Sequence, residues 1–197
     1  MTRYGKEHKE TTKRRIVEAA GRRFKRDGID GSGIAALMAD AGLTNGAFYA
    51  HFSSKDDLVA TAVADQLREQ RETYWQRPGA GVEQLVREYL SVPHRDDPEH
   101  GCPSAALLDE IGRCPISTKR AYTEGVLGIA DEIASRLAPD DPESARATTL
   151  SLFALLIGTL QLSRALADRQ LADEVLEQGI VNALALLAPV TVSSDGA

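Results

Sequence analysis

The spacing of apolar residues predicts helices along almost the whole chain. Between residues 12 and 27, apolar side chains recur every three or four positions and form one stripe. Residues 1–10 are charged and lack this period, which indicates a mobile arm. Gly and Pro separate the later helical segments. These segments are 54–77, 82–92, 103–113, 117–137, 143–168 and 171–187.

The composition supports a fold built of helices alone. The chain has 197 residues, of which 43% are hydrophobic and 5% aromatic. A low aromatic content with abundant Ala and Leu favours helix packing over sheets. A chain of this length can bury one large core, or a small domain beside a larger one. We therefore predict an all-α protein.

Residues 32–55 contain two short helices with a tight turn between them. Ser32 is placed to cap the first helix, and Gly42 supplies the left-handed residue that ends it. Thr44 caps the second helix, which extends to about Ala50. Two short helices joined by a turn of about four residues form a helix-turn-helix.

A family resemblance rests on these residues. The run Gly-Leu-Thr-Asn-Gly-Ala-Phe-Tyr-Ala-His-Phe-Ser-Ser-Lys-Asp-Asp-Leu, from Gly42 to Leu58, resembles the DNA-binding signature of the TetR family of bacterial transcriptional regulators. It covers about the first third of the chain. The resemblance implies a three-helix DNA-binding domain, residues 1–53, and a larger helical domain, residues 54–197, for effector binding and dimerisation. It implies a repressor that leaves a palindromic operator when a small molecule binds.

The second short helix carries small and polar residues suited to the major groove of double-stranded DNA. Asn45 can form two hydrogen bonds with an adenine edge, and Ala47 can contact a thymine methyl group. Ala47 departs from the family pattern, which often has a hydroxyl residue there. The family places phosphate contacts at Tyr49, His51 and Lys55. The expected DNA-binding residues are Ser32, Thr44, Asn45, Gly46, Ala47, Tyr49, His51 and Lys55.

Charge is distributed unevenly along the chain. Its overall net charge is −6, but residues 1–26 hold ten Lys and Arg against three Glu, a net charge of +7. Residues 61–197 hold twelve Lys and Arg against twenty-one Asp and Glu, a net charge of −9. A basic end joined to an acidic body fits a DNA-binding domain beside one that does not touch DNA.

The larger domain is expected to bind an effector and a second copy of the chain. An aromatic and apolar lining would suit a hydrophobic effector. The last two helices have more apolar positions than one core needs, which favours a homodimer interface. The expected effector site comprises Trp75, Tyr89, Leu107, Ile111, Tyr122, Val126 and Phe153, and the expected interface comprises Leu152, Leu156, Leu160, Leu176, Ile180 and Leu184.

Other functions have weaker support. The chain lacks the phosphate-loop, zinc-protease and nucleophile-elbow motifs, so we expect no enzyme, no catalytic residues and no cofactor. Cys102 and Cys114 leave open a thiol-redox regulator, but their spacing does not fit a metal site. A ligand-independent DNA-binding or interaction module is a further alternative. We expect a cytoplasmic protein without a membrane segment, since no signal peptide or long apolar run is present.

Overall fold

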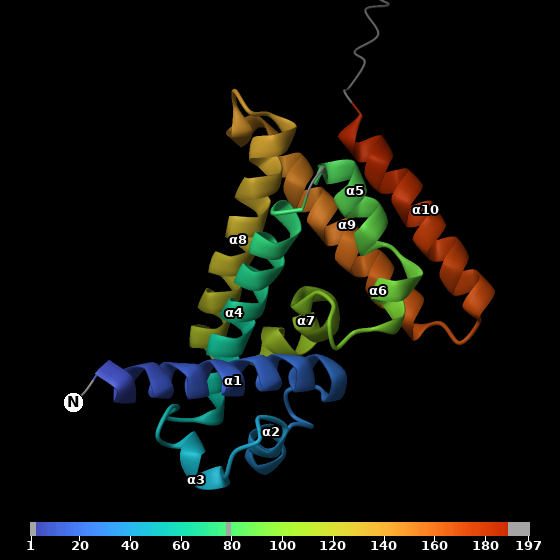
Figure 1. Cartoon of the computed structure of the whole chain (residues 1–197). Helices are drawn as coiled ribbons and strands as arrows, with labels where there is room; N and C mark the ends of the chain where they lie inside the picture. The colour runs from blue at the N-terminus through green and yellow to red at the C-terminus, as the bar shows by residue number, and fades with distance from the viewer. Residues whose placement is uncertain (1–2, 78–79, 189–197) are drawn as a thin grey trace, which may run out of the picture.

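The computed structural model describes residues 3–77 and 80–188, and within them the chain is helical without a strand. This confirms the all-α prediction. Figure 1 shows α1 lying across one end of the molecule, with α2 and α3 beyond it. The helices, in chain order, are α1 Arg3–Asp27, α2 Ile34–Asp40, α3 Asn45–Phe48, α4 Lys55–Trp75, α5 Val82–Tyr89, α6 Val92–Asp96, α7 Pro103–Arg113, α8 Ile116–Leu137, the short 3₁₀ turn η1 Pro142–Ala145, α9 Arg146–Ala165 and α10 Arg169–Leu187.

The N-terminal end of the fold is built around the apolar stripe of α1. Ile16, Ala20 and Phe24 are buried as predicted, and they lie in one cluster with Phe48 of α3. Gly28 and Gly42 both have positive φ angles, so they end α1 and α2 in the left-handed conformation that glycine adopts without strain. This cluster holds α2 and α3 against α1.

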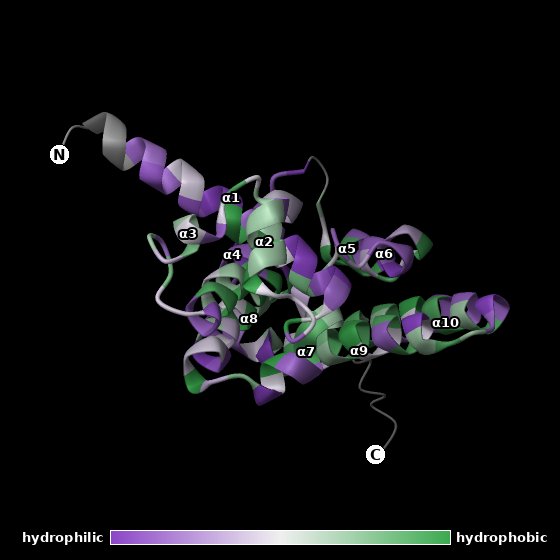
Figure 2. Cartoon of the chain, turned by 90° about the horizontal axis from the view of Figure 1, so that it is seen from below, coloured by the Kyte–Doolittle hydropathy of each residue, from purple (hydrophilic) through white to green (hydrophobic). Residues whose placement is uncertain are grey.

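The remaining helices extend away from this end. α4 packs against α1 at its start and along α8 beyond it, and α9 pairs with α10 (Figure 1). Figure 2 shows that α9 and α10 are the most apolar helices, whereas the first half of α1 is hydrophilic. Because α4 contacts both α1 and α8, it joins the N-terminal helices to the larger helical body.

Several predicted boundaries are wrong for local reasons. Residues 3–10 continue α1 rather than form an arm, and the predicted polar loop after Val92 contains the short helix α6, capped by Ser91. α4 begins at Lys55, and its cap is Ser54, which accepts from the Asp57 N–H, rather than Ser53 with Asp56. Pro115 rather than Ser117 precedes α8. The tail predicted from residue 189 lies outside the described residues.

Among the described residues, one helix is long and apolar enough to cross a membrane, although we expected no such apolar run from the sequence. By length and composition alone, residues Pro142–Ala165 pass that test. In this fold Leu152, Leu156 and Leu160 of the same helix are buried against the rest of the chain. A helix that packs in a core passes the same test of length and composition.

Candidate functional site

The short helix α3 presents one apolar and one polar side. Phe48 is fully buried, and its ring contacts Phe52 with centroids 5.8 Å apart. Thr44, Asn45 and Gly46 are exposed on the other side. α3 has four residues rather than the seven predicted, and Thr44 occupies its N-cap position without a side-chain hydrogen bond. The burial of Phe48 therefore holds an otherwise unstable helix so that its polar side faces outward.

Gly46 has no role in packing. A Cβ atom at this position would meet nothing within 4 Å, and its φ angle is not positive. Neither the fold nor the backbone conformation therefore requires glycine there. A glycine that the fold does not need is suited to close approach by a partner molecule.

Tyr49 is the most exposed large hydrophobic residue beside α3. It is 72% exposed and lies edge-on against Phe48, with ring centroids 5.1 Å apart. This exposure excludes a buried role for Tyr49 in the core. Its position leaves the hydroxyl free to contact an external partner.

His51 lies next to basic residues of α1. Its Nδ1 atom is buried without a hydrogen-bond partner. Burial, followed by the charges of Lys9 and Lys13, lowers the pKa of His51 below 6.5. The Lys13 ammonium also lies 5.5 Å from the centroid of the Phe52 ring. Basic side chains of α1 therefore lie close to the residues that follow α3. Lys9 and Lys13 were not among the site residues expected from the sequence.

Two expected DNA contacts are used inside the chain instead. Ser32 is fully buried, and its hydroxyl donates to the Gly28 carbonyl oxygen at 2.6 Å. It does not cap α2, because Gly33 holds the N-cap position. The Lys55 ammonium donates to the Ile29 carbonyl oxygen at 2.6 Å. In this conformation both side chains stabilise the turn between α1 and α2.

The same turn is held from the larger domain. Oε2 of Glu110, on α7, accepts hydrogen bonds from the backbone N–H of Ile29 at 2.7 Å and of Asp30 at 3.2 Å. Nζ of Lys25 donates to the Gly101 carbonyl oxygen at 2.9 Å. We call the turn Gly28–Gly31 with these contacts the junction. It ties the position of α2 to α7 and to the segment before it.

A groove opens beside the junction, between α1 and the larger domain. Its volume is about 530 Å³, within the range of small-molecule sites. α1, α4, α5 and the segment 94–102 contribute its walls. The lining residues are Glu18, Arg22, Lys25, Gln66, Glu69, Gln70, Thr73, Tyr74, Arg77, Leu85, Glu88, Tyr89, His94, Glu99, His100, Gly101 and Cys102.

The groove differs from the effector site expected from the sequence. Tyr89 is the one member of the expected set that lines it. Leu107 and Ile111 are buried in the core, and the Tyr122 hydroxyl donates to Ser104 Oγ at 3.0 Å. The remaining expected residues are partly buried outside the groove: Trp75, whose ring lies 3.8 Å from the Arg136 guanidinium, Val126 and Phe153. Apolar periodicity marks the core and cannot distinguish it from a cavity, so the expected effector set remains a prediction.

The residues expected at the dimer interface face the interior. Leu152, Leu156, Leu160 and Leu176 are buried within the single chain, so they leave no surface for a partner. Ile180 and Leu184 are partly buried and pack against the same core. The exposed apolar residues of α9 and α10 lie elsewhere on these helices and include Leu162 and Val181.

The cysteines do not form a redox pair in this fold. Cys102 and Cys114 are both free and lie at the two ends of α7. The eleven residues of α7 lie between them, so their Cα atoms are about 18 Å apart, whereas a disulfide requires less than about 7 Å. Burial, followed by the charge of Asp56, raises the pKa of Cys114 and makes its thiol less reactive. Within the described residues, no cluster of His, Cys, Asp or Glu is placed to hold a metal ion.

Comparison with known proteins agrees with this geometry. A family model described as "Bacterial regulatory proteins, tetR family" matches residues 16–62. The regulator TtgR of Pseudomonas putida and the probable regulator ArpR of Pseudomonas putida are each 41% identical over 69 residues, 35% of this chain. The match spans 32% of the length of each relative.

Similarity to solved structures extends over the whole fold. Escherichia coli NemR in its reduced form has a TM-score of 0.74 at 16% identity, covering 92% of this chain and all of the other. A TetR-family regulator from Cytophaga hutchinsonii has a TM-score of 0.73 at 18% identity, covering 90% and 96% of the two chains. At 16–18% identity these structures show a similar fold only. The family model matches the helix-turn-helix, within residues 16–62. Residues 16–62 therefore match the tetR family of bacterial regulatory proteins, and the fold as a whole is similar to that of TetR-family structures.

Proposed function

We propose that this protein is a ligand-responsive, DNA-binding transcriptional regulator, and that it acts as a repressor in the cytoplasm. The observation that carries the proposal is the exposed polar side of α3, with Asn45 and Gly46 outward and Phe48 buried behind them. A side chain such as Asn45 can form two hydrogen bonds with an adenine edge in the major groove. Residues 1–53 are the proposed DNA-binding domain, and residues 54–197 are the proposed effector-binding and dimerisation domain.

The proposed DNA contacts fall into two groups. Thr44, Asn45, Gly46 and Ala47 approach base edges, whereas Tyr49 and His51 contact phosphates. The exposed Lys9 and the half-buried Lys13 extend the phosphate group along α1. Phosphate contacts set the register of the protein on DNA, and the base contacts provide sequence preference.

The proposed oligomer is a homodimer formed through the outer faces of α9 and α10. Leu162 is 53% exposed and Val181 is 58% exposed. Ala154 and Gly158 of α9 share the exposed side with Leu162, and they are small enough to let a second pair of helices approach. An apolar face of this kind is suited to a second copy of the chain.

Selection from a random DNA library tests the regulator proposal. The full-length protein is expected to recover palindromic sites whose half-sites lie about 34–36 Å apart, one turn of DNA. Val181→Asp is expected to yield monomers that bind DNA weakly, whereas Glu177→Asp, an exposed polar change on the same helix, retains the dimer. Recovery of random sequences by the wild-type dimer would refute the proposal.

A further inference from the structure

The groove beside the junction contains a buried ammonium group that lacks an ionic partner. Lys25 is only 8% exposed, and its Nζ donates to a backbone carbonyl oxygen, that of Gly101. In the part of the chain that the structure describes, no carboxylate forms an ion pair with it. Burial is the main cause that lowers the pKa of Lys25 to about 8. A buried cation is costly without a counter-charge, so this site is suited to an anion.

The other charged residues of the groove lining carry both signs, and several of them are ion-paired. Arg77 pairs with Glu88 at 2.6 Å, Arg26 with Glu99 at 3.6 Å, and Arg14 with Glu18 at 3.5 Å. The lining charges outside these pairs are Arg22, Lys25 and Glu69. Arg22 precedes Lys25 by about one turn of α1 and, among the described residues, has no ionic partner. Lys25 and Arg22 are therefore the two lining cations without an ion pair among the described residues, and together they form the part of the groove suited to an anion.

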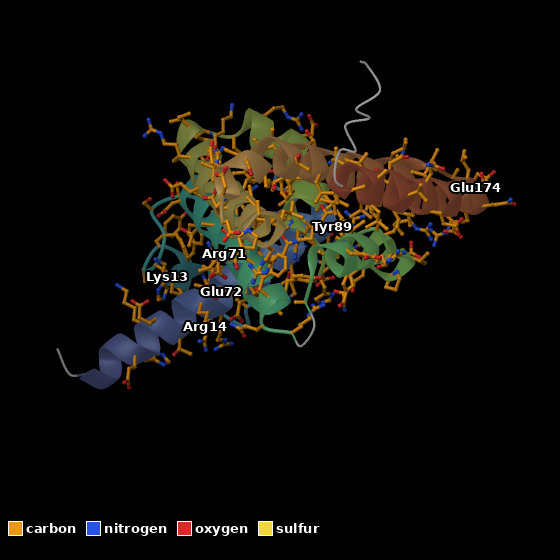
Figure 3. All side chains as sticks on the ribbon, turned by 90° about the horizontal axis from the view of Figure 1, so that it is seen from above. Lys13, Arg14, Arg71, Glu72, Tyr89 and Glu174 are labelled. Carbon is orange, nitrogen blue, oxygen red and sulfur yellow. The ribbon has the colours of Figure 1, made fainter. Side chains whose placement is uncertain are left out.

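Tyr89 supplies a hydrogen-bond donor at the same place. It is 6% exposed and lines the groove, and its hydroxyl forms no hydrogen bond of normal geometry. The Cys102 thiol beside it is a weak partner. Figure 3 shows Tyr89 well inside the molecule, far from Glu174 at the outer end of α10. Buried hydroxyl groups are normally hydrogen-bonded, so an unpartnered one in a groove points to a missing ligand atom.

The groove also has apolar surface for the body of a ligand. Leu85 and the rings of Tyr74 and Tyr89 lie in its lining. Glu69 and the paired glutamates make the surroundings unfavourable for an anion with two charges, such as phosphate. These features together favour a singly charged anion attached to an apolar group.

We propose that the groove binds a small organic monocarboxylate, whose carboxylate contacts Lys25, Arg22 and the Tyr89 hydroxyl while its apolar body lies against Leu85. The ligand would contact α1 of the DNA-binding segment as well as the larger domain. This assignment replaces the hydrophobic effector expected from the sequence with an amphipathic anion.

Binding at Lys25 would also change the junction. A carboxylate competes with the Gly101 carbonyl oxygen for the Lys25 ammonium. Gly101 leads into α7, and Glu110 of α7 holds the turn before α2. The ligand would therefore favour an arrangement in which Lys25 has released Gly101, and α7 and α2 would move with that segment. A ligand that binds one arrangement more tightly than another shifts the balance between them, and this is the requirement for coupling to DNA binding. This last step rests on the proposed function.

Thermal unfolding in the presence of matched probes tests the site. At pH 7, octanoate and benzoate are expected to raise the Tm of the full chain, whereas octanamide, benzamide and inorganic phosphate leave it unchanged. Lys25→Met is expected to abolish the shift, Lys25→Arg to keep part of it, and Lys119→Met, a lysine on α8 outside the groove, to keep all of it.

Four results would overturn the proposal. These are equal shifts with amides and carboxylates, a shift with phosphate alone, a carboxylate shift that persists in folded Lys25→Met, and no shift with either carboxylate. DNA binding by the same samples separates this inference from the regulator proposal. Selective DNA binding without a carboxylate shift refutes the ligand site alone, whereas a carboxylate shift without selective DNA binding refutes the regulator alone.

Discussion

The junction and helix α3 lie in the same N-terminal segment and are both rich in polar groups, but they use these groups differently. At the junction, Ser32, Lys55 and Glu110 are hydrogen-bonded to the backbone of one turn. On α3, Thr44 and Asn45 are exposed, and within the described residues their side chains have no hydrogen-bond partner. Polar groups that are hydrogen-bonded within the chain stabilise the fold, whereas exposed groups without such a bond are available to a partner.

This difference explains why sequence position alone misassigned two contacts. Ser32 and Lys55 occupy positions expected to face phosphate, yet their polar atoms bond to carbonyl oxygens within the chain. Their substitution should therefore affect stability before it affects DNA recognition. The predictions below compare substitutions at buried or hydrogen-bonded residues of the N-terminal segment with substitutions at its exposed residues.

Replacing the aromatic residue behind α3 has the largest expected effect. Phe48→Ala should lower the free energy of unfolding by about 3–5 kcal/mol, because it leaves a cavity in the core. Tyr49→Ala, at the neighbouring exposed position, should change it by less than about 0.5 kcal/mol. Both should weaken DNA binding. Urea unfolding measures the difference, and equal losses of stability would contradict the two-sided description of α3.

Removing the carboxylate at the junction has the next largest effect. Glu110→Ala leaves the N–H groups of Ile29 and Asp30 without their acceptor, at a cost of about 1–3 kcal/mol. Asp109→Ala is the matched control, since the ion pair that Asp109 forms with Arg113 is exposed to solvent and should add little to stability. Similar unfolding midpoints for the two variants would show that the junction adds little stability.

The buried lysine should make stability depend on pH in the alkaline range. The pKa of Lys25 is lowered from 10.5 to about 8 in the folded chain. As pH falls from 10.5 to 8, the unfolded chain binds this proton and the folded chain does not, so stability decreases. Lys25→Met should show a weaker dependence than Lys119→Met over this interval. Identical pH profiles would mean that Lys25 is charged and well solvated in the folded chain.

The smallest expected effect comes from His51. Burial lowers its pKa below 6.5, so the unfolded chain is protonated first as pH falls. Stability is therefore lost as pH decreases below the unfolded value, and His51→Gln should lose less than the wild type between pH 7 and 5. Thermal unfolding at several pH values measures this difference. A larger loss in His51→Gln would mean that folding raises the pKa of His51 instead of lowering it.

Helical periodicity predicted the architecture well but not the chemistry of its cavities. The buried stripe of α1, the bounds of α7 and the glycine ends of α1 and α2 follow from local rules. The partners of Lys55 and Glu110 depend on contacts between residues distant in sequence. For the same reason many of the apolar residues expected at the effector site and interface are buried in the core, since a periodic pattern does not show which side another helix covers.

The proposed function depends above all on the free side of α3 reading DNA sequence. Fluorescence anisotropy with a selected palindrome and with random DNA, at a fixed salt concentration, measures the specificity ratio, which we expect to be about 10³ or more for the wild type. Asn45→Ala should reduce the free-energy difference between palindrome and random DNA by roughly 1–3 kcal/mol per half-site. Lys9→Ala should weaken binding to the palindrome and to random DNA equally. A wild-type ratio near unity, or an unchanged ratio in Asn45→Ala, would contradict sequence reading by α3.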